Sequence, residues 1–153
     1  MTEKNIDLTK YVGKWYEIES FPQWFQKGCA DTIAEYTDKG KYIEVKNTCS
    51  IETNTNVRQD KIKIGKAFTT KQPDLLKVQF FFPFKGDYQI EHVDIVNNKY
   101  QNAIVGNKNK KYLWILSRNQ KISDKKLTEL KTIAKEKGYD ITKLEKNQKY
   151  KSE

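Results

Sequence analysis

The sequence predicts an all-β fold: an eight-stranded antiparallel up-and-down β-barrel, with one C-terminal α-helix packed outside it. Three observations favour this fold. Short segments with alternating apolar and polar residues recur up to residue 118, and short stretches of turn-forming residues connect them. One segment with the apolar spacing of a helix follows. No linker or repeat divides the 153 residues. We therefore expect one domain over 1–153, with the barrel at about 12–118, the helix at about 123–138 and a tail at 139–153.

The eight strands are expected in segments whose side chains alternate between two faces. Residues 14–21 alternate Trp and Glu with Tyr, Ile and Ser, and residues 30–37 lead into a turn at Asp38-Lys39-Gly40. Gly40 suits the positive φ that such a hairpin turn needs. The other expected strands are residues 42–49, 57–68, 75–82, 87–96, 100–106 and 112–118.

The expected helix follows the last strand. Residues with helical spacing form one apolar face, namely Leu127, Leu130, Ile133 and Ala134. Ser123 fits the N-cap and Gly138 the position after the C-cap. A helix with a single apolar face packs that face against the outside of the sheet.

Composition and charge limit the class of protein. The net charge is +9, aromatic residues make up 12% of the chain, and the lysines are spread along its length. The aromatic content argues against disorder, and the dispersed charge favours a solvated surface over a nucleic-acid site. No apolar run approaches a membrane span, and no signal peptide is recognisable. We expect a cytoplasmic protein if Met1 is native, and a periplasmic, outer-membrane-associated or secreted one if Met1 replaces a removed leader.

Several motifs resemble those of a known family. Gly13-Lys14-Trp15 resembles the G-x-W signature that opens the lipocalin family, and "YLWILSR", ending at Arg118, resembles its third signature. "YQNAIVG" is similar to the segment that holds the second signature. Further similar segments, in the expected order over residues 7–145, are "FPQWFQKG", "ADTIAEYT", "VQFFFPF", "GDYQI" and "EKGYDITKL". Together they resemble the branch of bacterial lipocalins, plant temperature-induced lipocalins and apolipoprotein D.

The G-x-W tryptophan has an expected structural role. When an eight-strand meander closes, the first and last strands become neighbours, so Trp15 and Arg118 meet at one end of the barrel. A guanidinium stacked on an indole contributes ~1–2 kcal/mol and closes that end. We therefore interpret Gly13, Trp15 and Arg118 as structural.

The resemblance implies a non-enzymatic carrier of a fatty acid, lysophospholipid or similar lipid, with no cofactor. The apolipoprotein D type of site implies ligand contacts from Tyr36, Asn47, Phe80, Tyr88 and Trp114, and strand alternation adds Val78 and Phe82. Such a lining would bind an acyl chain through buried area, at ~0.8 kcal/mol per CH₂. The alternative is a barrel filled with side chains.

The opposite end of the barrel is expected to carry aromatic residues. Trp24 and Phe25 follow the first strand, and Phe84 lies in the turn before the sixth. These rings would form either a lid or a rim that contacts lipid. With the positive charge, they predict peripheral contact with an anionic membrane. We expect a monomer or a weak homodimer.

The two cysteines would face each other across the second hairpin. If Thr37 pairs with Lys41, then Cys29 pairs with Cys49, but the same register turns Asn47 outward unless one strand contains a bulge. Related bacterial lipocalins resemble this chain in having paired cysteines, which implies a disulfide in an oxidising compartment. In the cytosol both would remain thiols.

Two other functions remain open at this stage. One is an enzyme on the same scaffold that uses Cys29 or Cys49, and the other is a basic barrel that binds single-stranded nucleic acid. The inward rings and the helix after the barrel argue against specific nucleic-acid binding. The single histidine, His92, shares the expected face of Tyr88 and offers no metal site.

Overall fold

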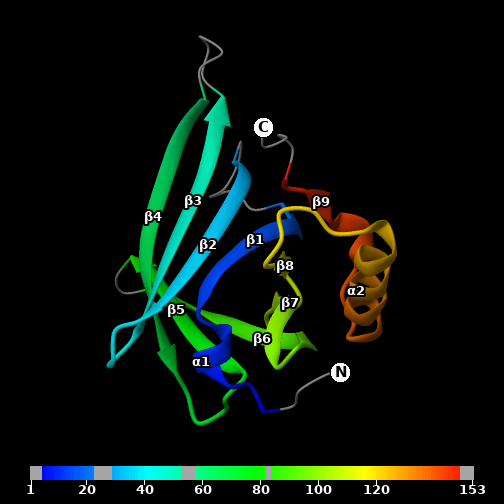
Figure 1. Cartoon of the computed structure of the whole chain (residues 1–153). Coiled ribbons are helices and arrows are strands. Elements are labelled where there is room, and N and C mark those ends of the chain that lie inside the picture. Colours follow the sequence, from blue (N-terminus) through cyan, green and yellow to red (C-terminus); the bar gives the residue numbers. More distant parts are fainter. Residues whose placement is uncertain (1–4, 23–28, 53–57, 82–83, 149–153) are drawn as a thin grey trace.

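The computed structural model describes residues 5–22, 29–52, 58–81 and 84–148 (Figure 1). Within these residues the main sheet contains eight long strands. They are β1 (Gly13–Ser20), β2 (Ala30–Asp38), β3 (Ile43–Glu52), β4 (Arg58–Thr69), β5 (Leu75–Phe81), β6 (Phe84–Val96), β7 (Lys99–Gly106) and β8 (Leu113–Ser117). Their bounds lie close to those expected from alternation.

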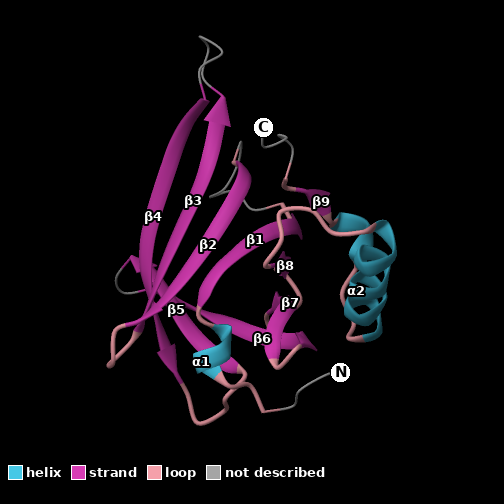
Figure 2. Ribbon diagram, in the orientation of Figure 1, coloured by secondary structure: helices cyan, strands magenta, loops and turns pink. Residues whose placement is uncertain are grey.

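The sheet closes on itself. Each strand from β2 to β7 pairs antiparallel with the next, and β1 pairs with both β2 and β8. Trp15 lies opposite Ala34 of β2, and Tyr16 lies opposite Ser117 of β8. The predicted eight-stranded antiparallel barrel is therefore confirmed, and Figure 2 shows the strands as a curved wall with the long helix to one side.

In the described part of the chain, two α-helices lie outside the strands. Helix α1 (Leu8–Tyr11) precedes β1, with the Asp7 side chain accepting a hydrogen bond from Thr9 N at its start. Helix α2 (Asp124–Glu136) has the predicted Ser123 N-cap, which accepts a hydrogen bond from Lys126 N, and Gly138 follows it with φ +99°. Helix α1 was not predicted from the sequence.

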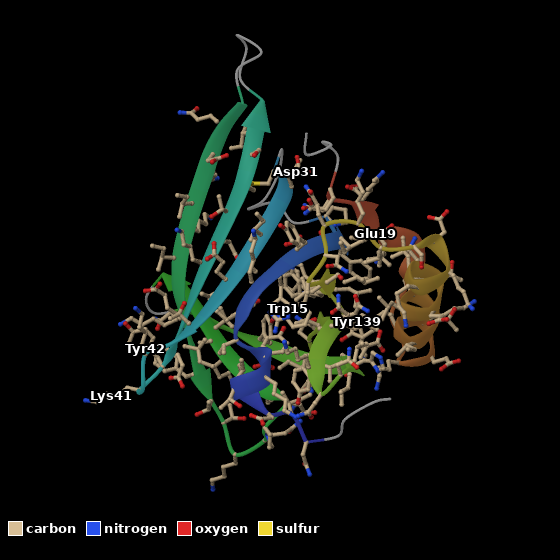
Figure 3. The ribbon with its side chains drawn as sticks, in the orientation of Figure 1. Trp15, Glu19, Asp31, Lys41, Tyr42 and Tyr139 are labelled. Atoms are coloured by element: carbon tan, nitrogen blue, oxygen red, sulfur yellow. A yellow bond between two sulfur atoms is a disulfide. The ribbon has the colours of Figure 1, made fainter. Side chains whose placement is uncertain are left out.

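One apolar cluster lies inside the barrel, and a second lies between the barrel and α2. The inner cluster includes Trp15, Ala34, Tyr36, Val45, Tyr88 and Leu116, together with Tyr11 of α1. The outer cluster joins β1 and β8 to the helix and includes Ile18, Ile115, Leu130, Ala134 and Tyr139. Figure 3 shows Trp15 near the start of β1 and Tyr139 on the side of α2.

The predicted tail contains a further strand. After a 3₁₀ helix (Ile141–Lys143), β9 (Glu145–Lys146) pairs with Glu19 and Ser20 of β1, beyond the point where β2 stops pairing with β1. The tail therefore covers the seam where the first two strands diverge.

The expected register of the β2–β3 hairpin was wrong. Asp38 pairs with Ile43, and Lys39 N donates to Tyr42 O at 2.9 Å, so the connection is longer than the expected three-residue turn. Tyr36 consequently pairs with Val45. The bulge that the sequence analysis required lies between Ala30 and Ile33, where Asp31 has φ +54°.

The expected face of His92 was also wrong. The register of β6 against β7 shifts between Ile90 and His92, so the histidine leaves the face that it would share with Tyr88. His92 is buried on the outside of the barrel, and its Nε2 is 2.7 Å from Asp94 Oδ1. Lys126 of α2 lies 3.4 Å from the other carboxylate oxygen of Asp94.

Candidate ligand-binding site

One end of the barrel is closed by a stacked arginine. The guanidinium carbon of Arg118 lies 3.7 Å from the centroid of the fully buried Trp15 ring. Its nitrogens donate to the backbone carbonyl oxygens of Lys10, Tyr11, Val12, Lys14 and Tyr100 at 2.8 to 3.2 Å. Gly13 has φ +109°, and an added Cβ would lie 3.3 Å from Arg118 Nη1. The close approach of the arginine therefore favours glycine at this position.

Three tyrosines form a hydroxyl cluster above this closed end. The Tyr36 and Tyr88 oxygens are 2.7 Å apart, and the Tyr11 hydroxyl also hydrogen bonds to that of Tyr88. Burial raises the pKa of all three hydroxyl groups, so they stay neutral. The sequence analysis missed Tyr11, because it lies before the first expected strand and no alternation places it inside.

The structure brings four of the predicted ligand contacts together. Trp114 stacks on Tyr88 with a centroid distance of 6.4 Å, and both rings belong to the barrel interior with Tyr36. Val78 packs against the same interior cluster. Tyr112, two residues before Trp114 in the chain, stacks on it with a centroid distance of 5.8 Å. Their contact with a ligand stays a prediction.

The wall nearer the other end is more polar. Asn47 is half-buried and pairs with Ala34, whose side chain belongs to the interior cluster, so the corrected register turns Asn47 inward. Lys63 of β4 pairs with Asn47 and alternates with the buried Gly65 and Ala67, which places it on the same inner face. Lys63 was not predicted as a site residue, although its separation of four residues from Ala67 places both on one face of a strand.

Several predicted residues fall where the structure gives no side chain. Trp24, Phe25 and Phe82 lie outside the described residues. Phe80 and Phe84 are described only as backbone positions, in β5 and β6.

The two cysteines form a disulfide. The Cα atoms of Cys29 and Cys49 are 5.3 Å apart, and the bond closes a segment with a sequence separation of 20. The bulge in β2 allows this bond to coexist with an inward Asn47. Neither sulfur is a free thiol in this state.

Glu17 and Glu19 lie on different faces of β1, although simple strand alternation would place them on one face. A register shift lies between them: Glu17 pairs with Leu116 of the interior cluster, whereas Glu19 pairs with Ile115 of the outer cluster. Glu19 Oε1 lies 3.0 Å from Lys131 Nζ of α2.

Glu17 has no such cation among the described residues. It is 3% exposed, its Oε1 accepts no hydrogen bond in the part of the chain described, and burial raises its pKa to about 7. The nearby Ser20 hydroxyl offsets part of this rise. The Glu17 carboxyl is thus a polar group inside an otherwise aromatic and aliphatic layer.

Other site types find no support in the described ranges. No group of three or more His, Cys, Asp or Glu side chains there could hold a metal ion. None of the helices described is long and apolar enough to span a membrane.

Comparisons with known proteins agree with this architecture. The model of the family "Lipocalin-like domain" matches residues 6–149. Temperature-induced lipocalin-1 of Arabidopsis thaliana is 37% identical over 154 residues, covering 94% of this chain and 79% of the relative. Outer membrane lipoprotein Blc of Escherichia coli (strain K12) is 35% identical over 144 residues, with 92% and 77% covered.

A mammalian relative and a solved structure extend the likeness. Apolipoprotein D of Mus musculus is 32% identical over 153 residues, covering 93% of this chain and 76% of the relative. The structure of insecticyanin from the tobacco hornworm Manduca sexta shares the fold, with a TM-score of 0.70 at 20% identity, and 98% and 84% of the two chains covered. The closed barrel, the G-x-W and arginine contact and these matches together show that the chain belongs to the lipocalin family, whose members bind small hydrophobic ligands.

Proposed function

We propose that this protein carries a fatty acid, lysophospholipid or similar long-chain lipid inside its barrel, without catalysing a reaction. The observation that carries the proposal is the interior contact of Tyr36, Val78, Tyr88 and Trp114 above an end closed by Trp15 and Arg118. An aromatic and aliphatic lining gives an acyl chain ~0.8 kcal/mol per buried CH₂.

The lipid would lie with its head group at the more polar end. Asn47 and Lys63 face inward there, and their amide and ammonium groups suit a carboxylate or phosphate. The chain would extend towards Trp114 and Tyr88. An acyl chain longer than the interior of the barrel would leave its head group outside the barrel.

The disulfide argues against an enzyme that uses a cysteine. A thiolate is the nucleophile in such chemistry, and a sulfur held in the Cys29–Cys49 bond supplies none. The bond also favours an oxidising compartment, in line with a periplasmic or membrane-associated location rather than the cytosol. Relatives of this chain include an outer membrane lipoprotein.

A peripheral membrane contact is part of the proposal. Ile62 and Ile64 on the outer face of β4 are 54% and 57% exposed, and Lys46 lies opposite Ile64. Both belong to the long β3–β4 pair that extends beyond the other strands in Figure 1. With a net charge of +9, this face should bind anionic vesicles better than neutral ones. Equal binding to both vesicle types, or no loss with Ile62→Ser and Ile64→Ser, would reject the contact.

We also propose an oligomeric state and a limit on nucleic-acid binding. The protein acts as a monomer or weak homodimer, which sedimentation over a range of concentrations tests. Nucleic acid binds only through dispersed positive charge, so any binding should vanish at moderate salt.

The central experiment measures lipid binding to the delipidated protein. A fluorescent fatty acid should bind saturably and quench tryptophan emission. Val78→Trp places a large ring in the interior and should abolish binding, whereas Val96→Trp makes the same change at a half-exposed position and should not. Absence of saturable binding to the native protein, or equal binding by both variants, would contradict the proposal.

A further inference from the structure

Two buried polar atoms on neighbouring strands have no hydrogen-bond partner among the described residues. They are Oε1 of Glu17 on β1 and Oγ1 of Thr32 on β2. The two residues are only 3% and 1% exposed. Such atoms are costly to bury unsatisfied, so a bound water molecule or a polar group of a ligand is expected to satisfy them.

Both side chains face the interior of the barrel. Glu17 lies two residues after Trp15 and pairs with Leu116, and both of these neighbours belong to the interior cluster. Thr32 lies two residues before Ala34, which is also interior.

The two residues also lie side by side. Trp15 pairs with Ala34, and the next inward positions along the two strands are Glu17 and Thr32. The strands diverge at this level, and Gln148 from the tail enters between them. Its Nε2 donates to the carbonyl oxygens of both Glu17 and Thr32, at 3.0 and 3.1 Å. The tail therefore satisfies the two backbone carbonyl groups, whereas Glu17 Oε1 and Thr32 Oγ1 have no hydrogen-bond partner among the described residues.

A hydroxyl group matches this pair of atoms. It can donate a hydrogen bond to the Glu17 carboxyl oxygen and accept one from the Thr32 hydroxyl. A methylene leaves both atoms unsatisfied, a carboxylate would meet another carboxyl group, and an ammonium group would have to bring a charge into a buried layer. We propose that Glu17 and Thr32 form a polar subsite on the barrel wall that binds a hydroxyl group of the lipid, so that the preferred cargo is a hydroxylated lipid.

This inference rests on the proposed lipid-carrier function and names the ligand class more closely. The test displaces a fluorescent fatty acid with stearic acid and with a series of monohydroxylated stearic acids, in which the hydroxyl occupies successive positions along the chain. The acids share one head group and one length, so their differences report on the hydroxyl alone. At least one hydroxystearic acid should bind about tenfold more tightly than stearic acid, as expected of a buried hydrogen bond.

Substitutions test whether Glu17 and Thr32 cause the preference for a hydroxystearic acid over stearic acid. Thr32→Val keeps the shape and removes the hydroxyl, and Glu17→Met keeps the approximate length and removes the carboxyl group; each should bring the ratio of the two affinities close to one. Thr37→Val and Glu35→Gln make matched changes at exposed positions of β2 and should keep the native ratio. Circular dichroism would check that each variant is folded, and the ratio within one variant does not depend on its overall affinity.

The outcomes separate the two proposals. Saturable binding of stearic acid with no preferred hydroxystearic acid overturns the subsite alone. A preference that survives both Thr32→Val and Glu17→Met also overturns it. Failure of every acid to bind saturably overturns the carrier function together with the subsite.

Discussion

The buried carboxyl of Glu17 should make the stability of the protein depend on pH. Burial raises its pKa from 4.5 to about 7, so the folded protein holds this proton more tightly than the unfolded chain does. The stabilising contribution of the protonated Glu17 carboxyl is therefore fully present below pH 4.5 and is lost as the pH rises to about 7. At about 1.4 kcal/mol per pH unit, ionisation costs the folded state about 3 kcal/mol at higher pH.

Glu17→Gln removes the ionisation and keeps the shape. Urea unfolding of the ligand-free proteins should show equal stability near pH 4, with the variant about 3 kcal/mol more stable at pH 8. Glu35→Gln, at an exposed position of β2, should follow the native curve at both pH values. If the native protein and Glu17→Gln lose stability in parallel between pH 4 and 8, the carboxyl is not buried as described and the reasoning fails.

Three other changes test the closed end and the hairpin. Arg118→Ala removes the stack on Trp15 and five backbone hydrogen bonds, and should lower the unfolding free energy by about 2–4 kcal/mol in urea; a loss below about 1 kcal/mol would contradict a closing role. Replacing Cys29 and Cys49 by Ser should cost about 3 kcal/mol, and dithiothreitol should destabilise the native protein but leave this variant unchanged; equal sensitivity of both would exclude the disulfide. Tyr11→Phe leaves the Tyr88 hydroxyl one partner short and should lower thermal stability by about 1 kcal/mol; an unchanged melting temperature would argue against the hydroxyl cluster.

Local patterns in the sequence predict most of the secondary structure. Alternation locates all eight long strands, because a half-buried strand must repeat every two residues. Ser123 and Gly138 locate the two ends of α2 to within two residues. An N-cap side chain accepts a hydrogen bond from a free N–H group at the start of a helix, and glycine adopts the positive φ that often follows the C-cap. The closure of the barrel followed from the strand count and the family resemblance.

The bulges could not be predicted in the same way. One extra residue in β1 separates Glu17 from Glu19, and another in β6 moves His92 outside. A bulge reverses every side chain beyond it while leaving the local composition unchanged, so alternation assigns the wrong face. The predicted β2–β3 register was wrong for a related reason, because Asp38-Lys39-Gly40 fits turns of more than one length.

The least predictable parts of the site depend on contacts between distant segments. Tyr11 reaches Tyr88 across 77 positions of sequence, and Gln148 reaches Glu17 across 131. No local pattern encodes such contacts. The polar pair of Glu17 and Thr32 becomes recognisable only when the partners of both backbones are known.

Native mass spectrometry of the freshly purified protein tests the carrier function most directly. The account predicts a bound lipid that delipidation removes and that an added long-chain acid replaces at one molecule per chain, with Val78→Trp remaining empty. A native protein that stays ligand-free before and after addition of the acid would contradict the claim that this barrel holds a lipid.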